Sequence, residues 1–427
     1  MVAPHIPGFV FDEARNRYFR LQSATQANPS SMEYTVQHVR QVGREQKRKR
    51  KANQVKRQEE KKNKKPPPTM YSMLLNRSLG GTMCKERIQT KFLDTKSTVQ
   101  FSNMTPQDSI THMATPETSS EILLVGTQAG LVCATKILEE LRSTDPETTR
   151  LSLSAFDLSF SQTGISSVQI SEDGNAFWTT KASGNASSKA FFSRVNFLNE
   201  LEVQSLTTVS TELIADIQCS YKIRSSNSFA LGGCNRIALF DAHAQSMSNI
   251  LHTKSEVFSL QGMHDANTAM LYAGLRNRNV LAIDTRQSNR RRAAVLCRHV
   301  SSVCNMRVVT PSQPKIIVCG LDCKMALYDL RFIREHKSEP LVQYVGYGNE
   351  YQRVTPLSVD ETNTTILAAG EKNVVRFWSL EDPLFNTEHV LNSPDQISAS
   401  SSTWFNDTSR DEKGWMVSAG SQIQIFV

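Results

Sequence analysis

Short apolar runs bounded by turn residues recur along the chain from about residue 84 to its end. Six of them end in glycine: Leu123-Leu-Val-Gly126, Phe229-Ala-Leu-Gly232, Leu271-Tyr-Ala-Gly274, Ile317-Val-Cys-Gly320, Leu367-Ala-Ala-Gly370 and Val417-Ser-Ala-Gly420. A seventh run, Ala176-Phe-Trp-Thr179, has threonine in the place of the glycine. The last residues of successive runs are 42 to 53 residues apart, which indicates an internal structural repeat.

Each glycine run has similar neighbours on both sides. An earlier strand-like run precedes several of them, at Val168–Ile170, Ile214–Ile217, Val257–Leu260 and Val303–Met306. A polar turn and a third run follow, at Arg236–Phe240, Val280–Ile283, Met325–Tyr328, Val374–Trp378 and Ile423–Phe426. Seven such units predict an all-β fold, a seven-bladed β-propeller. An open β-sandwich, or two sandwich domains, is the alternative, and the regular spacing disfavours it.

The glycine and alanine positions have a physical reason in a propeller. Strands near the axis have little lateral room, so small residues there let neighbouring sheets approach closely. A closed ring also needs its last blade completed by a strand from the N-terminal side. We expect Arg87–Leu93 (RIQTKFL) to be that closing strand.

Composition divides the chain into three regions. Residues 1–31 hold an aromatic motif, residues 32–70 form a basic helical or disordered arm, and residues 84–427 form the propeller. The arm is rich in Lys, Arg, Glu and Gln, which favour helix, and its apolar positions predict a helix over 32–42. Pro66-Pro67-Pro68 then interrupts the chain.

The net charge of +8 comes from one segment. Residues 44–65 hold 12 Lys/Arg and 3 Asp/Glu. Subtracting these from the totals of 49 and 41 leaves 37 basic and 38 acidic residues elsewhere. A near-neutral body of this kind is poorly suited to gripping a phosphate backbone by itself.

The sequence predicts no membrane association and no secretion. No run of 18 apolar residues occurs, and Met1–Arg20 lacks the apolar core of a signal peptide. The eight cysteines form no Cys-x-x-Cys pair, so we expect reduced thiols inside the cell.

The repeat resembles the WD-repeat family in degenerate form. The third runs end in Phe240-Asp241, Ile283-Asp284, Tyr328-Asp329 and Trp378-Ser379, where family members typically end in Trp-Asp. The Gly-His pair that usually precedes each blade is missing, so individual blade boundaries stay uncertain. The resemblance implies a seven-bladed WD-repeat propeller with a partly helical, basic N-terminal extension.

Two strand ends have a more specific resemblance. Ile283-Asp284-Thr-Arg286 and Tyr328-Asp329-Leu-Arg331 are similar to the Trp-Asp-x-Arg box of WD-repeat substrate receptors for cullin-4 ubiquitin ligases. The resemblance implies docking on the damaged-DNA-binding adaptor of that ligase. Asp and Arg two apart on a strand project to one side, and an oriented arginine suits an interface. A local ion pair that closes a turn is the alternative role.

The N-terminus resembles one subgroup, the cullin-4-associated factor four-like WD-repeat proteins. The resemblance rests on Ile6-Pro-Gly-Phe-Val-Phe-Asp12 and Asn16-Arg-Tyr-Phe-Arg20. This unit is too short to fold alone, so it must bury its rings on the propeller or on a partner. We predict a partner motif with these members: Pro7, Gly8, Phe9, Phe11, Tyr18 and Phe19.

The basic arm contains two clusters with bipartite spacing, which acidic grooves of nuclear-import receptors recognise. The clusters consist of Lys47, Arg48, Lys49, Arg50, Lys51, Lys61, Lys62, Lys64 and Lys65. We expect nuclear localisation with a cytoplasmic pool. A weak, salt-dependent contact between residues 44–65 and nucleic acid is an alternative, as is a solvated linker. No aromatic residue interrupts the arm, which disfavours base stacking.

No catalytic or metal-binding motif stands out. The glycine pairs lack the residues of a phosphate-binding loop, and Gly126-Thr-Gln-Ala-Gly130 has no nucleophile at its centre. Cys319 and Cys323 lie across a predicted hairpin with no nearby histidine, which favours buried cysteines over a zinc site. We therefore predict a protein that is not an enzyme, with no cofactor and no metal.

These observations favour a non-catalytic adaptor, the substrate receptor of a cullin-4 RING ubiquitin ligase, that brings an unknown protein substrate to the ligase. The alternative is a nuclear WD-repeat scaffold in ribosome or RNA assembly. The Ser/Thr-rich segments 137–165 and 180–190 are the longest predicted insertions between strands, and they are candidates for target-specific loops.

Overall fold

The computed structural model divides the chain into two compact units, Met1–Met73 and Leu74–Val427. The structure describes these residues: 9–12, 17–20, 95–101, 104–105, 108–116, 122–136, 150–153, 156–161, 163–183, 187–196, 202–223, 226–263, 269–287, 293–309, 314–331, 339–360, 362–370, 374–380, 382, 386–391, 401–407 and 412–426. Of the first unit they include one antiparallel hairpin, β1 (Phe9–Asp12) with β2 (Arg17–Arg20). The expected helix over 32–42 lies outside the described residues.

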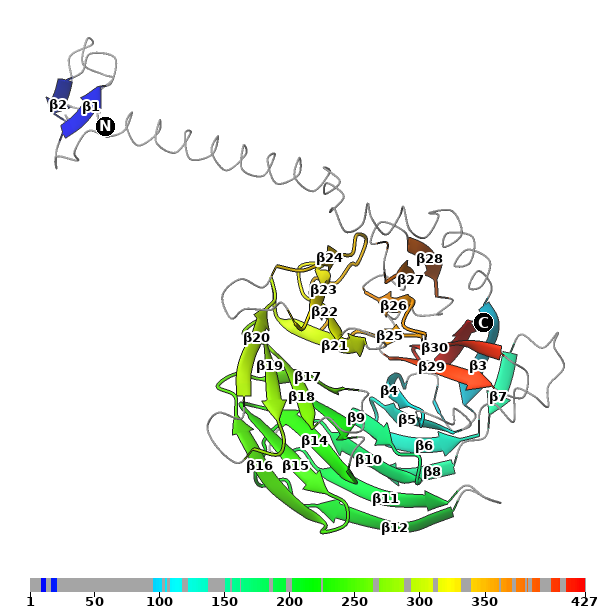
Figure 1. Ribbon diagram of the computed structural model, residues 1–427. Coiled ribbons are helices and arrows are strands. Elements are labelled where there is room, and N and C mark those ends of the chain that lie inside the picture. The colour runs from blue at the N-terminus through cyan, green and yellow to red at the C-terminus, as the bar shows by residue number, and fades with distance from the viewer. Residues whose placement is uncertain are drawn as a thin grey trace, which may run out of the picture. The chain divides into compact units, whose positions relative to one another are not determined.

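The second unit is a seven-bladed β-propeller, as the repeat predicts (Figure 1). Each blade is built on an antiparallel sheet of four strands, which follow one another outward in chain order in blades 1 to 6. The first strand of every blade contacts the first strand of the next, and the last contacts β4 again, so the ring is closed. For blades 1 to 7 the first strands are β4 (Ile110–Ala114), β9 (Ile165–Ile170), β13 (Cys219–Ile223), β17 (Val257–Gly262), β21 (Val303–Val309), β25 (Leu357–Val359) and β29 (Ser402–Asp407).

The second strands are the glycine runs of the sequence repeat, and all seven predicted runs are confirmed as strands. They are β5 (Leu123–Thr127), β10 (Asn175–Thr180), β14 (Ser228–Gly233), β18 (Met270–Leu275), β22 (Lys315–Gly320), β26 (Thr365–Ala369) and β30 (Glu412–Ala419). The third strands are β6 (Leu131–Thr135), β11 (Ala190–Asn196), β15 (Arg236–Asp241), β19 (Asn279–Asp284), β23 (Met325–Asp329), β27 (Val374–Ser379) and β31 (Gln422–Phe426).

The fourth strands complete the blades. They are β8 (Phe156–Phe160), β12 (Glu202–Val209), β16 (Ser246–His252), β20 (Ala293–Arg298), β24 (Val342–Gln343), β28 (Asn386–Val390) and, in blade 7, β3 (Thr95–Phe101). Blade 7 has a fifth strand, β7 (Arg150–Leu153), which pairs parallel to β3. The segment 137–165, expected to be an insertion, therefore contains two strands, because its short alternating apolar stretches find sheet edges to pair with.

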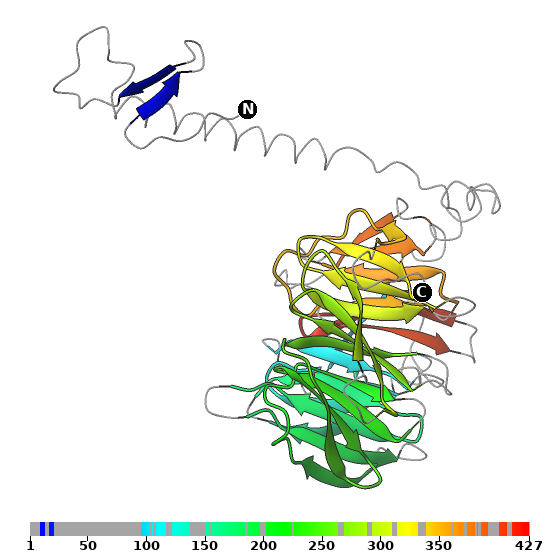
Figure 2. The ribbon, with the colours of Figure 1, turned by 60° about the vertical axis from the view of Figure 1, so that its left-hand side comes forward.

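The ring closes through β3, which pairs antiparallel with the last strand, β31. In Figure 1 the cyan β3 accordingly lies beside the red C-terminal strands, and in Figure 2 the cyan strands of blade 1 lie next to them. Closure by an N-terminal strand is thus confirmed, but the segment that closes the ring is Thr95–Phe101. The expected closing segment, Arg87–Leu93, lies outside the described residues.

One predicted first strand was wrong. Ile214–Ile217 forms a bend, and the first strand of blade 3 begins at Cys219. Both isoleucines are buried, and the backbone N–H of Ile217 donates to Ser188 Oγ at 2.9 Å. The apolar pattern therefore predicted correctly that these side chains are buried, but they are buried in a bend and not in a strand.

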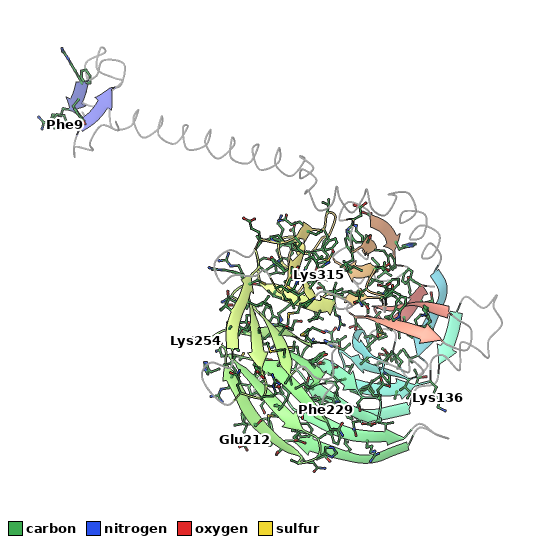
Figure 3. All side chains as sticks on the ribbon, in the orientation of Figure 1. Phe9, Lys136, Glu212, Phe229, Lys254 and Lys315 are labelled. Atoms are coloured by element: carbon green, nitrogen blue, oxygen red, sulfur yellow. The ribbon has the colours of Figure 1, made fainter. Side chains whose placement is uncertain are left out.

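The core is divided into layers between neighbouring blades. Each of seven apolar clusters joins two adjacent blades, for example Phe177 of β10 with Phe229 and Phe240 of blade 3. The rings of Phe177 and Phe229 stack at 4.7 Å, and Phe229 is labelled within the packed side chains of Figure 3. Stability of the ring thus depends on close contact between sheets.

The glycines at the ends of the second strands permit that contact. A Cβ on Gly232 would lie 2.6 Å from Val257 Cγ1, and one on Gly274 would lie 2.4 Å from Val303 Cγ1. Both valines begin the first strand of the following blade. The expected reason for small residues near the axis is therefore confirmed at these positions.

Gly274→Ala should lower the stability of the propeller by about 1–3 kcal/mol, because the added methyl group overlaps Val303. In a protein that already carries Val303→Ala, Gly274→Ala should cost less stability, because the side chain that the methyl group overlaps has been shortened. Gly348→Ala is the matched control, since its Cβ would meet only Arg376, at 4.0 Å. Thermal unfolding of the four variants measures this, and equal effects of Gly274→Ala and Gly348→Ala would contradict the packing explanation.

Candidate functional site

Both Asp-x-Arg boxes lie where the third strand of a blade ends. Asp284 is the last residue of β19 in blade 4, and Asp329 is the last residue of β23 in blade 5. Ile283 and Tyr328, which precede the aspartates, are buried in the layers between blades. Each box therefore joins a buried anchor to a surface turn.

The two boxes have the same internal geometry. The backbone N–H of Arg286 donates to Asp284 Oδ1 at 3.0 Å, and its Nε donates to the same oxygen at 3.2 Å. In the second box the corresponding distances from Arg331 to Asp329 Oδ1 are 2.9 and 3.1 Å. In both, the second carboxylate oxygen accepts from Nη2, at 3.4 Å and 2.7 Å. The aspartate thus closes the turn and holds the planar guanidinium in one orientation.

The arginines remain accessible while the aspartates are mostly covered. The side chains of Arg286 and Arg331 are 68% and 43% exposed, against 17% and 5% for Asp284 and Asp329. The local ion pair expected as the alternative role is present in both boxes. Both guanidinium groups nevertheless stay partly exposed to solvent, so the ion pair and an interface role are compatible.

The two boxes also share one face of the ring. In each blade the box lies beside the start of the second strand, with Asp284 opposite Met270 and Asp329 opposite Lys315. At the other end of β18, Gly274 packs on Val303, the start of the next blade, which fixes both blades in the same orientation. The ends of β19 and β23 therefore point to the same side, termed here the box face.

A third, related turn lies on this face in blade 3. Asp241 ends β15 and its Oδ1 accepts from the backbone N–H groups of His243, at 2.9 Å, and Ala244, at 3.2 Å. Histidine occupies the place of the arginine here, and its Nε2 contacts Asn227 at 3.0 Å. Sequence reasoning noted Asp241 only as a strand end. Three consecutive blades thus present the same aspartate turn.

Electrostatics within the boxes follow from these hydrogen bonds. Donation from the Arg331 side chain holds the pKa of Asp329 below its ordinary value of 3.8. Donation from the Arg286 side chain lowers the pKa of Asp284 in the same way. Both carboxylates are therefore charged at neutral pH, and each ion pair is intact.

The other predicted site residues are described only in part. Phe9 of the N-terminal hairpin is 42% exposed, and Tyr18 and Phe19 are partly buried. Phe11 lies in β1 opposite Tyr18, but Pro7 and Gly8 lie outside the described residues. The basic clusters between Lys47 and Lys65 lie outside them as well.

No group of three or more His, Cys, Asp or Glu side chains that could hold a metal ion occurs among the described residues. Cys319 is buried in β22 and Cys323 lies partly exposed in the turn that follows. Nor does the described part of the chain contain a helix long and apolar enough to cross a bilayer.

Comparison with known proteins now decides the family. Residues 160–405 match the family model described as the DDB1- and CUL4-associated factor 4 beta-propeller domain. The chain belongs to this family. The subgroup resemblance drawn from Ile6–Asp12 and Asn16–Arg20 is thereby supported by an independent part of the chain, the propeller itself.

Two curated relatives of this family member agree with the assignment. WD repeat-containing protein 21 of Schizosaccharomyces pombe is 26% identical over 389 residues, covering 88% of each chain. The human DDB1- and CUL4-associated factor 4 is 29% identical over 168 residues, which cover 38% of this chain and 31% of the human protein.

Solved structures support the fold. The WD40 β-propeller domain of Doa1 matches with a TM-score of 0.56 at 13% identity, covering 79% of this chain and 96% of that one. Raptor of Chaetomium thermophilum matches with a TM-score of 0.59 at 13% identity, covering 80% and 30%. At this identity the likeness shows a shared propeller fold.

Acid should weaken the second box in a way that depends on Asp329. Because its folded-state pKa lies below 3.8, the stabilisation is present above about pH 4 and is lost as pH falls through the folded value. Asp329→Asn should therefore flatten the fall of the melting temperature below pH 4. Asp284→Asn removes a more exposed carboxylate and should flatten the fall of the melting temperature less. A larger effect of Asp284→Asn than of Asp329→Asn would contradict the view that Asp329 contributes most of this acid sensitivity.

Proposed function

We propose that this chain is a non-catalytic substrate receptor of a cullin-4 RING ubiquitin ligase that docks on DDB1 through its two Asp-x-Arg boxes. The observation that carries the proposal is the matched pair of exposed arginines, Arg286 and Arg331, on one face of adjacent blades. Membership of the DDB1- and CUL4-associated factor 4 propeller family supports the choice of partner.

The physical advantage of the boxes is preorganisation. Arginine side chains are flexible, and fixing one at an interface costs conformational entropy. In each box the aspartate has already fixed the guanidinium, which lowers that cost on binding. Two such groups on neighbouring blades present several N–H donors in a defined spacing, suited to carboxylates or backbone carbonyls of a partner.

The receptor role requires no bond making by the propeller. Binding a target protein on one surface and DDB1 on another raises the concentration of the target near the catalytic components of the ligase. The aromatic hairpin β1–β2 offers a second contact, because Phe9 is 42% exposed in a unit too small to bury its own rings.

The alternative, a nuclear scaffold in ribosome or RNA assembly, depends on the basic arm. That arm lies outside the described residues, and no residue that the structure describes in the propeller favours this role over docking on DDB1. Nuclear import through the two basic clusters remains part of the proposal and is compatible with either role.

Arg286→Ala combined with Arg331→Ala should reduce co-purification of DDB1 with the full chain at least about tenfold, because two preorganised contacts are lost. Arg276→Ala is the matched control, an exposed arginine paired with Glu256 at 3.2 Å on the opposite face of blade 4. Equal capture of DDB1 by the double variant and the control would contradict docking through the boxes.

Replacing the basic residues of Lys47–Lys51 and Lys61–Lys65 with glutamine should shift a fluorescent fusion of the full chain from the nucleus to the cytoplasm. The reason is that import receptors recognise the positive charge of both clusters. Fluorescence microscopy measures the nuclear fraction. Nuclear accumulation unchanged by the substitutions would refute the import signal.

A further inference from the structure

The face opposite the boxes carries a long, structured connection between blades 5 and 6. Residues 345–356, termed here the channel-mouth loop, contain no strand yet are held by specific hydrogen bonds. Trp378 Nε1 donates to the carbonyl of Val345 at 2.9 Å, and the fully buried Asn349 donates to the carbonyl of Gln352 at 2.9 Å. The loop is therefore preorganised.

Arg353 of this loop reaches across the ring. It donates to Gln218 Oε1 at 2.6 Å and lies over the ring of Phe258, 5.1 Å from its centroid. Gln218 immediately precedes the first strand of blade 3, and Phe258 lies at the start of the first strand of blade 4. The loop follows blade 5, so Arg353 reaches past blade 4 to blade 3 beside the first strands that line the central channel.

A second cation lies at the same mouth. Lys181 follows the end of β10, and its backbone N–H donates to the carbonyl of Gly164, which precedes the first strand of blade 2. Burial, and then the charge of Arg353, lower the pKa of Lys181. Burial and the charge of Lys181 lower the pKa of His112 to about 3, so this neighbour is neutral.

Two carboxylates near Arg353 have other direct partners. Asp216 accepts from Gln218 Nε2 and is linked to Arg353 only through that shared Gln218, while Glu256 pairs with Arg276 at 3.2 Å. No carboxylate among the described residues forms an ion pair with Lys181 or Arg353. Arg353 and Lys181 thus repel each other without a direct carboxylate partner among the described residues, and a bound anion would relieve that repulsion.

Exposed apolar groups lie in the same loop as Arg353. Among the described residues, seven large apolar side chains are exposed, and three of them lie in the channel-mouth loop. They are Val345 at 47%, Tyr351 at 82% and Val354 at 39%. A concentration of this kind on one ordered loop marks a surface for a protein partner.

We propose that the channel mouth binds an acidic peptide segment of the protein to be ubiquitinated, with Arg353 and Lys181 contacting its carboxylates and Tyr351 and Val354 contacting its apolar side chains. That the bound protein is ubiquitinated rests on the proposed function, but the binding of the peptide does not. The two cations come from different blades, which suits successive side chains of an extended peptide. A phosphate group, by contrast, favours several donors that converge on one point.

The test is fluorescence anisotropy with the full chain and a labelled peptide of glutamate and leucine residues spaced by glycine and serine. Two matched peptides carry lysine or phosphoserine in place of glutamate. The glutamate peptide should bind more tightly than the lysine peptide, and added salt should weaken it. Arg353→Gln with Lys181→Gln should reduce its affinity at least about tenfold.

Matched variants separate this site from general charge. Lys254→Gln removes an exposed cation at the periphery of the propeller, labelled in Figure 3, and should leave the affinity unchanged. Tyr351→Ala should weaken binding several-fold. Loss of binding by the double variant could also reflect misfolding. Arg353→Glu avoids this problem, because it should bind the lysine peptide more tightly than the glutamate peptide, and only a folded protein can show that reversal.

Defined outcomes overturn the proposal. They are no binding of the glutamate peptide, equal binding of the lysine peptide, or an affinity that the double variant and Arg353→Glu leave unchanged. Binding of the phosphoserine peptide alone would overturn the carboxylate assignment. Peptide binding without any capture of DDB1 would instead contradict the proposed function and leave this site intact.

Discussion

The antiparallel pairing of β3 with β31 holds the propeller closed. It joins Thr95–Phe101 to the last strand of the chain and completes blade 7 from two distant segments. Val99 of β3 is fully buried in the cluster that links blades 7 and 1, together with Ile423 of β31. Without this pairing the last strand would be an unpaired sheet edge, and the layers on either side of blade 7 would open.

The closed ring has two faces, the box face and the face opposite, and each face carries a different set of side chains. On one face, third strands end in aspartate turns that fix exposed arginines in blades 4 and 5. On the other, second strands end in glycines that bring the sheets together, and the channel-mouth loop crosses between blades. A ligase adaptor on the first face would leave the second free for a target, which is the arrangement that a receptor requires.

The sequence was sufficient for the fold because each repeat carries a local signal. The apolar runs that end at Gly126, Gly232 and Gly274 became second strands, since the same steric constraint recurs in every blade. The sequence was less reliable where buried residues lie outside strands, and where strands lie outside the repeat pattern. Ile214 and Ile217 are buried in a bend, and β7 and β8 lie in a segment whose short apolar stretches gave no repeat signal.

The candidate sites were predictable only where their residues lie close together in the sequence. Asp284, Arg286, Asp329 and Arg331 were visible because aspartate and arginine keep a fixed spacing at repeated strand ends. Arg353 and Lys181 were not, since 172 positions separate them and only ring closure brings their charges together. The one local signal was the length of the connection 345–356, too long for a simple turn between strands.

The most direct test of this account is the structure of the full chain bound to DDB1, determined by cryo-electron microscopy. The account predicts that DDB1 covers Arg286 and Arg331 on the box face and leaves the channel-mouth loop exposed. A complex in which DDB1 covers residues 345–356 while both arginines remain in solvent would contradict it.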